Sequence, residues 1–161
     1  MIGIESLPKA AVLDTNLVLL LLVGQVGPTL ILSYKRVAMF TLDDLHLLSE
    51  LLNKFDVSCT TSSILTEVSN LLQHAPMHRR SMLMNKLAEY AIQIAEINIP
   101  SAELVKLEAF FQLGLTDAGL SQIARTYTVI TTDFHLAGRI ASAKYHSINF
   151  NHLRSNQLLI R

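Results

Sequence analysis

The sequence predicts an α/β protein, a three-layer sandwich in which helices cover both faces of a central, mainly parallel β-sheet. Three short apolar or β-branched segments fit buried strands: AAVL (10–13), DVSCTT (56–61) and TVITT (128–132). Helical segments follow each of them, and this alternation implies parallel strands joined by right-handed crossovers. The 161 residues, 50% of them hydrophobic, suit a single domain spanning 1–161.

The helices of the first half are indicated by capping residues and helix breakers. Glycines and Pro28 end the first helix, which is apolar on all sides. Thr41 caps the second helix, Ser62 or Ser63 caps the third, and Pro76 stops that third helix. The four helices expected in this half span 16–24, 41–55, 64–75 and 79–94.

The second half continues the alternation. AEINIP (95–100) is a possible short strand, TVITT is the third core strand, and SINF (147–150) is a last strand. One helix is expected to end at Gly114, and the next begins directly after it. The helices expected in this half span 101–114, 115–127 and 133–145, and no repeat or linker interrupts them.

Four carboxylates stand where such a sheet would bring them together. Asp14 directly follows the strand 10–13, and Asp133 directly follows TVITT. The carboxyl ends of parallel strands share one edge, where the binding crevice of an open sheet lies. Asp117 begins the helix that leads into TVITT, and Glu67 lies about one turn into the helix after DVSCTT. We therefore expect the four acids to converge at this edge.

Each acid also has a simpler explanation. Asp14, Asp117 and Asp133 stand at or beside helix starts, where Asp is a favoured cap, and a lone Glu67 is typical of a solvated helix face. Other capping residues stand beside the three aspartates, however, so all four acids at one edge favour a functional site. These alternative caps are Thr15, Asn16, Thr116 and Thr132.

Clustered carboxylates repel one another, and a divalent metal ion removes that conflict. Carboxylate oxygens suit Mg²⁺ or Mn²⁺ better than a soft metal that prefers Cys or His. A water made more acidic by such an ion can attack a phosphodiester. The sequence therefore indicates metal-assisted hydrolysis.

The ordered set of motifs resembles the PIN-domain ribonucleases, which include the VapC-like toxins of bacterial toxin–antitoxin pairs. The resemblance rests on VLDTNLVLLLL, SSILTEVSNLL, LGLTDAGLSQIA and VITTDFHLAGRI, which cover most of the chain. It implies a Mg²⁺- or Mn²⁺-dependent endoribonuclease that hydrolyses RNA, and it suggests a homodimer with a small antitoxin as partner. On this match the catalytic, metal-binding acids are Asp14, Glu67, Asp117 and Asp133, and the polar supports are Asn16 and Thr132.

Two features depart from a minimal toxin of that family. The segment GQVGPTLILSYKRVAMFT (24–41) lengthens the chain, and the formal net charge of +0 argues against broad electrostatic attraction to RNA. The basic residues near the expected crevice are candidates for local contacts to RNA phosphates. These are Lys35, Arg36, His78, Arg79, Arg80, Arg139 and Lys144.

Two other functions are alternatives, and the sequence disfavours the second of them. A PIN-like fold that has lost its metal would be a non-catalytic RNA- or protein-binding module. A phosphoacceptor signalling domain would need an Asp at the end of its middle strand, and DVSCTT supplies only Ser and Thr.

The sequence also predicts a cytoplasmic protein. No basic start leads into an unbroken apolar segment, and the apolar run 17–32 is too short and too interrupted to span a bilayer. The lone Cys59 excludes an internal disulfide and fits a reducing compartment.

Overall fold

The computed structural model describes residues 6–159 and contains a sheet of five strands in the order β3-β2-β1-β4-β5. All neighbouring strands are parallel, so the predicted α/β architecture is confirmed. The strands are Ala10–Leu13 (β1), Val57–Thr60 (β2), Ala95–Glu96 (β3), Thr128–Thr131 (β4) and Ser147–Asn149 (β5).

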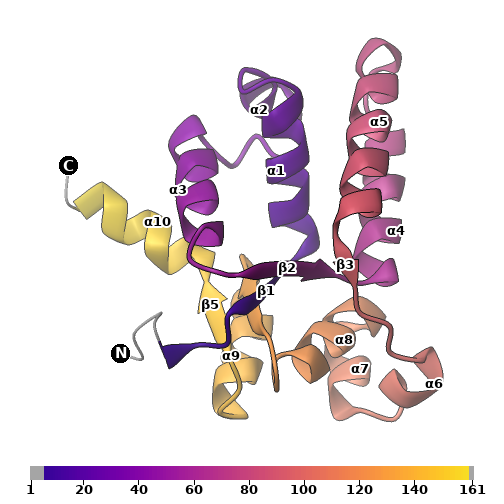
Figure 1. Ribbon diagram of the computed structural model, residues 1–161, viewed down its shortest axis with the longest axis vertical. Coiled ribbons are helices and arrows are strands. Elements are labelled where there is room, and N and C mark those ends of the chain that lie inside the picture. Colours follow the sequence, from indigo (N-terminus) through magenta and orange to yellow (C-terminus); the bar gives the residue numbers. More distant parts are fainter. Residues whose placement is uncertain (1–5, 160–161) are drawn as a thin grey trace.

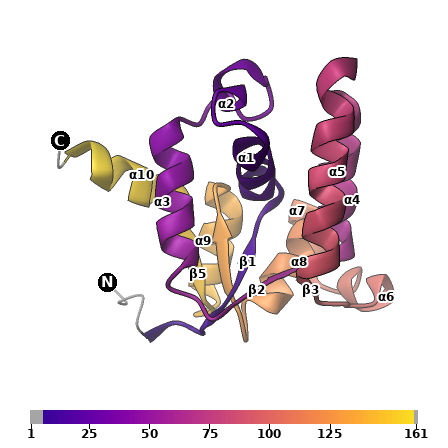
Figure 2. The same ribbon diagram turned by 45° about the horizontal axis from the view of Figure 1, so that its top comes forward.

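Helices cover both faces of this sheet, which gives the three layers seen in Figures 1 and 2. One face carries α1 to α5, and the other carries α6 to α9. The helices are Thr15–Val26 (α1), Leu30–Ser33 (α2), Leu42–Leu52 (α3), Ser62–Gln73 (α4), Met77–Gln93 (α5), Ser101–Leu104 (α6), Glu108–Leu113 (α7), Leu115–Ile123 (α8), Phe134–Ser142 (α9) and Phe150–Leu159 (α10).

The strand order reverses at the central strand β1. The chain moves outward from β1 through β2 to β3, and then returns to the other side of β1 to form β4 and β5. Ligand sites in open α/β sheets lie where the order reverses in this way, beyond the carboxyl ends of the two strands concerned. Here these strands are β1 and β4, whose register pairs Leu13 with Ile130. Asp14 and Asp133, which follow these strands directly, are therefore at the reversal point.

The segment 24–41, which the sequence leaves without a role, belongs to the hydrophobic core. Ile31, Val37 and Phe40 are all buried within it. The Tyr34 hydroxyl donates a hydrogen bond of 2.9 Å to the Leu71 carbonyl oxygen of α4. The helix α2 within this segment, which the sequence did not predict, packs against α1 on the outer side of this layer.

The prediction of one helix over 101–114 is wrong, because the chain forms two helices there, α6 and α7. Leu104 and Ala109 are both buried, and α6 and α7 each contact α8. Residues five apart on one helix point about 140° away from each other, so a single straight helix would not bury both against α8. The break between the two helices lets both residues face inward.

Two further boundaries differ from the prediction. Thr61, and not Ser62 or Ser63, caps α4: its backbone is extended and its hydroxyl accepts the Ile64 N–H at 3.3 Å. Phe150 does not end the last strand but begins the unpredicted α10, and its side chain is fully buried. Among the described residues, no helix is long and apolar enough to cross a bilayer.

Helix α10 is attached to the first face of the sheet by Arg154. Its guanidinium donates to Asp44 Oδ1 at 2.8 Å and to the Met39 carbonyl oxygen at 2.8 Å, and it lies over the Phe40 ring. Asp44 is buried and also completes a capping box with Thr41 at the start of α3. One arginine therefore fixes α10 to α3 and to the loop before it.

We expect Arg154→Ala to lower the free energy of unfolding by about 1 kcal/mol, since it removes charge-assisted bonds to a buried carboxylate from a partly exposed side chain. Urea unfolding followed by circular dichroism measures this. Arg36→Ala, which removes an exposed arginine, is the control and should leave the midpoint unchanged. Equal unfolding midpoints for both variants would show that the contacts of Arg154 do not contribute to the stability of the fold.

Candidate functional site

Asp14 is buried at the end of β1, and the structure satisfies both of its oxygens. Oδ1 accepts the Leu17 N–H at 2.9 Å, as the N-cap of α1. Oδ2 accepts three further bonds, from the Thr131 hydroxyl at 2.7 Å, the Thr132 N–H at 2.6 Å and the Thr132 hydroxyl at 3.1 Å. A carboxylate is tolerated beside the apolar strand because four donors surround it.

Burial nevertheless raises the pKa of Asp14 above its ordinary value, although the bonds from Thr131, Leu17 and Thr132 act in the opposite direction. The loss of hydration therefore destabilises the charged carboxylate by more than the hydrogen bonds stabilise it. A positive group at this point would stabilise the ionised carboxylate.

Asp133 and Asp14 are linked by hydrogen bonds to the same threonine, Thr131. The Thr131 hydroxyl, which donates to Asp14, also accepts the Asp133 N–H at 2.9 Å. Asp133 Oδ1 accepts the Leu136 N–H at 2.9 Å and caps α9. The Asp133 side chain is exposed, and its other oxygen makes no hydrogen bond within the described part of the chain.

The simpler explanation, that the aspartates are helix caps, is confirmed for Asp14 and Asp133. Each directly precedes the first helical residue with an extended backbone, the position from which a carboxylate reaches the free N–H groups. For Asp117 the cap position is taken by Gly114, whose φ of +85° suits glycine. Capping therefore accounts for the hydrogen bond of one carboxylate oxygen in Asp14 and in Asp133. It does not account for the position of Asp117.

Glu67 on α4 connects the starts of two other helices. Its Oε2 accepts the Thr15 hydroxyl at 2.7 Å, and its Oε1 accepts the Thr116 hydroxyl. Thr15 begins α1 beside Asp14, and Thr116 is next to Asp117 on α8. These two bonds hold Glu67 between the segments that carry the other acids.

Asp117 lies within electrostatic reach of the other three acids. Burial and the charges of Asp133, Glu67 and Asp14, in that order of size, raise the pKa of Asp117 to about 6. The four carboxylates, which come from four separate segments of the chain, thus share one region beyond the carboxyl ends of β1 and β4.

The two predicted polar supports contact each other. The Asn16 amide donates to the Thr132 hydroxyl at 3.4 Å, and that hydroxyl donates to Asp14. Thr131, which bonds both Asp14 and the Asp133 backbone, was not predicted. The signal for it was the pair of threonines that directly precedes Asp133.

A hollow of about 510 Å³ opens beside two of the acids. Arg139 is the residue, among the basic candidates for phosphate contact, that lines it. Its guanidinium donates to the Gln112 amide oxygen and lies 3.5 Å from Glu108 Oε2. We call this cavity the acidic hollow; its lining residues are Gln112, Leu113, Asp117, Asp133, His135 and Arg139.

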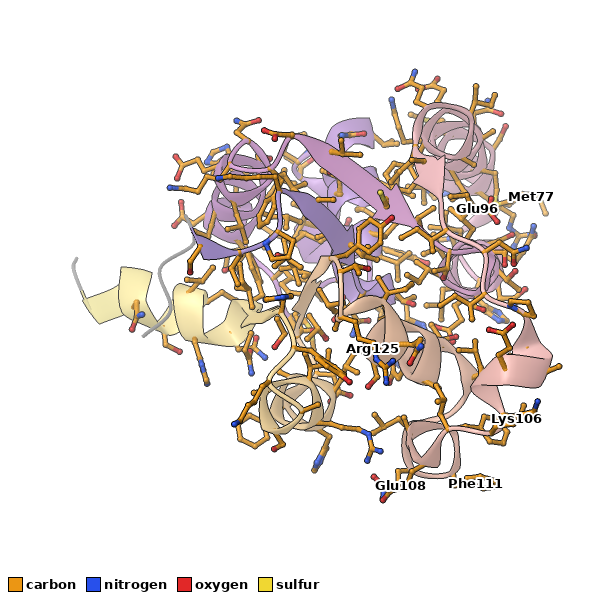
Figure 3. The ribbon with its side chains drawn as sticks, turned by 60° about the horizontal axis from the view of Figure 1, so that its bottom comes forward. Met77, Glu96, Lys106, Glu108, Phe111 and Arg125 are labelled. Carbon is orange, nitrogen blue, oxygen red and sulfur yellow. The ribbon has the colours of Figure 1, made fainter. Side chains whose placement is uncertain are left out.

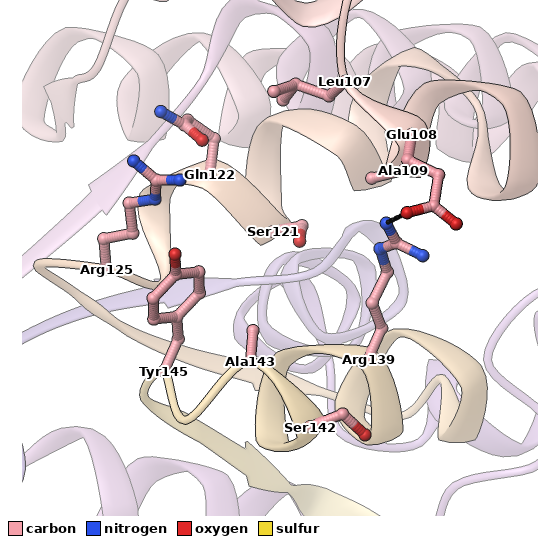
Figure 4. Close-up of a pocket in the computed structure, with 10 residues that line it drawn as sticks. All are labelled: Leu107, Glu108, Ala109, Ser121, Gln122, Arg125, Arg139, Ser142, Ala143 and Tyr145. Carbon is pink, nitrogen blue, oxygen red and sulfur yellow. Dashed lines mark ion pairs between the residues drawn. The ribbon is translucent and has the colours of Figure 1, made fainter.

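Arg139 also borders a second hollow, of about 350 Å³, between α7, α8 and α9. Figure 4 shows Arg139 beside Glu108 on one side of it, and Arg125, Gln122 and Tyr145 on the other. The Arg125 guanidinium lies over the Tyr145 ring, 5.3 Å from its centroid. Neither hollow presents a thiol or a pair of histidines for a soft metal.

The donor chemistry of the four acids fits a hard divalent cation, because every candidate ligand is a carboxylate oxygen. As the side chains stand, no three His, Cys, Asp or Glu residues within the described part of the chain are grouped to hold one ion. Their oxygens face protein donors instead: four donors for Asp14 and two threonine hydroxyls for Glu67. Binding would therefore require some of these bonds to be exchanged.

The structure disfavours a phosphoacceptor domain for a different reason from the one that the sequence indicated. The central strand is β1, not the strand within DVSCTT, and it does end in an aspartate. Asp14, however, has both oxygens bonded and a side chain that is only 6% exposed. An acceptor carboxylate must reach its phosphoryl donor, so burial and not strand order disfavours this function.

Comparisons of the chain with protein-family models, with curated proteins and with solved structures found no match. The family resemblance thus rests on the motifs alone, and the fold class rests on the strand order and the two helical layers.

Proposed function

We propose that this protein is a divalent-metal-dependent endoribonuclease that hydrolyses RNA phosphodiester bonds. The observation that supports the proposal most is the convergence of Asp14, Glu67, Asp117 and Asp133 at the point where the strand order reverses. Four carboxylates at one site cost stability through mutual repulsion, which a structural role alone does not explain. A function that uses their combined negative charge does explain it.

The four acids would hold Mg²⁺ or Mn²⁺, and the bound ion would supply a more acidic water and neutralise charge on the leaving oxygen. The chain prepares this site with hydroxyl groups. Thr131 and Thr132 fix the position of Asp14, while Thr15 and Thr116 fix that of Glu67. Asp117 and Asp133 line the acidic hollow, where a phosphodiester has room to enter.

A non-catalytic RNA- or protein-binding module is the alternative function. The observation that favours it is the complete hydrogen bonding of Asp14 within the protein. In such a module the acids would serve as caps and structural acceptors, and neither Mg²⁺ nor Mn²⁺ would bind.

Product analysis tests the nuclease directly. We expect the purified protein to cleave a mixed RNA pool with Mn²⁺ and not with EDTA. Because water and not the RNA 2′-hydroxyl is the attacking group, the products should carry 5′-phosphate and 3′-hydroxyl ends. Cleavage that persists in EDTA, or that leaves 2′,3′-cyclic phosphates, would mean that the four acids are not the catalytic centre.

The same proposal extends to partners and location. The protein acts in the cytoplasm as a homodimer, and a small antitoxin inhibits it by placing an Arg or Lys side chain among the four acids. Light scattering at micromolar concentration tests the dimer. A strict monomer would count against the proposal that the protein is a toxin with an antitoxin partner. It would leave the proposed nuclease activity unaffected.

A further inference from the structure

Two exposed phenylalanines are sequence neighbours of residues that line the acidic hollow. Phe111 is 77% exposed and Phe134 is 69% exposed, whereas Phe40, Phe55 and Phe150 are buried. Phe111 directly precedes two residues that line the hollow, and Phe134 lies between two others. Figure 3 shows Phe111 at the periphery of the molecule, in α7. Both exposed phenylalanines are therefore carried by the two helices, α7 and α9, that also supply lining residues of the acidic hollow.

The fold does not use these rings. The buried face of α9 consists of Leu136, Ala137 and Ile140, and Phe134 is the first residue of that helix. The Phe134 ring packs edge to face with His135, with 6.4 Å between centroids, and the Phe111 ring packs in the same way with the neighbouring Phe110 at 5.2 Å. Replacing either exposed ring should therefore leave the core unchanged.

The charges around the hollow do not favour a phosphate backbone. Asp117 and Asp133 line it, and its one arginine is already engaged by Glu108 and Gln112. The whole chain adds no attraction, because its 13 basic and 13 acidic residues balance. A nucleic acid that enters this site must gain much of its affinity from contacts other than phosphate pairing.

We propose that Phe111 and Phe134 are stacking surfaces for unpaired bases, so that the acidic hollow selects single-stranded RNA. This inference rests on the proposed nuclease function. Aromatic faces bind bases of any identity, and bases in a duplex are already stacked and cannot reach them. The lining of the hollow is mainly polar and charged, which suits individual bases better than the continuous apolar face of a protein partner.

Binding of a fluorescein-labelled 20-nucleotide RNA of mixed sequence, followed by anisotropy in EDTA, tests the inference without cleavage. Phe134→Ala and Phe134→Leu should each weaken binding about tenfold, while Phe134→Tyr should retain it. An abasic strand of the same length, which keeps the phosphates, should bind at least about tenfold more weakly than the RNA. Met77→Ala on α5, which removes an 84% exposed apolar side chain remote from Phe111 in Figure 3, is the matched control.

The outcomes separate the two proposals. Equal binding of the abasic strand and the RNA, or full binding by Phe134→Leu or Phe134→Ala, would overturn base stacking and would leave the ring as a contact for a protein partner. If the wild-type protein also cleaves RNA with Mn²⁺, that result removes the stacking inference alone. Wild-type protein that neither binds nor cleaves RNA would overturn the nuclease proposal and this inference together.

Discussion

Replacing Asp14 by Asn should lower Mn²⁺-dependent RNA cleavage by at least about a hundredfold, the upper range for disturbing residues that only support a metal site. The amide removes a negative charge that a cation requires. It also cannot keep every bond of Asp14: Oδ2 accepts three donors and Oδ1 accepts one, and an amide has an acceptor on one side only. Initial rates on one labelled RNA measure the loss.

The matched control is Glu50→Gln, the same exchange of carboxylate for amide on the exposed face of α3. It should cleave at the wild-type rate. If Asp14→Asn retains wild-type activity while its fold is intact, Asp14 acts as a helix cap only and the catalytic centre lies elsewhere.

Replacing Asp117 by Asn should stabilise the metal-free protein at neutral pH. Burial and three neighbouring carboxylates raise the pKa of Asp117 to about 6 from 3.8. The folded state therefore binds more protons than the unfolded state between these values, and its stability falls as the pH rises through them. A shift of this size corresponds to about 3 kcal/mol, which solvent screening of this partly exposed group reduces to roughly 1–2 kcal/mol.

Thermal and urea unfolding in EDTA at pH 8 and at pH 4 measure this effect. The gain from Asp117→Asn should be complete at pH 8 and nearly absent at pH 4, where the wild-type side chain is neutral as well. Adding Mn²⁺ should raise the melting temperature of the wild type and not that of the variant. A variant no more stable than wild type at pH 8 would show that the acids do not repel one another in solution.

The strands and the convergence of the acids could be predicted from the sequence because both follow from local patterns. β1 and β4 are short apolar or β-branched runs, and an aspartate ends each run. Once these strands are parallel neighbours, the positions of Asp14 and Asp133 follow. The helix caps were harder to predict, since several residues beside each aspartate have suitable side chains and only backbone conformation decides among them.

Contacts between distant segments account for what the sequence did not predict. The attachment of α10 depends on Arg154 meeting Asp44, residues 110 positions apart. The bridging role of Thr131 depends on the register of β4 against β1, and the break before α7 depends on packing against α8. No local pattern contains this information.

Binding of Mn²⁺ to the purified protein tests the central claim most directly, because every catalytic proposal depends on the four acids holding a divalent ion. Titration followed by electron paramagnetic resonance should show saturable binding of at least one Mn²⁺ per chain. Asp14→Asn, Asp117→Asn and Asp133→Asn should each weaken it strongly, and Glu50→Gln should not. Absence of saturable binding, or the same binding in all four variants, would contradict the metal site and favour the non-catalytic module.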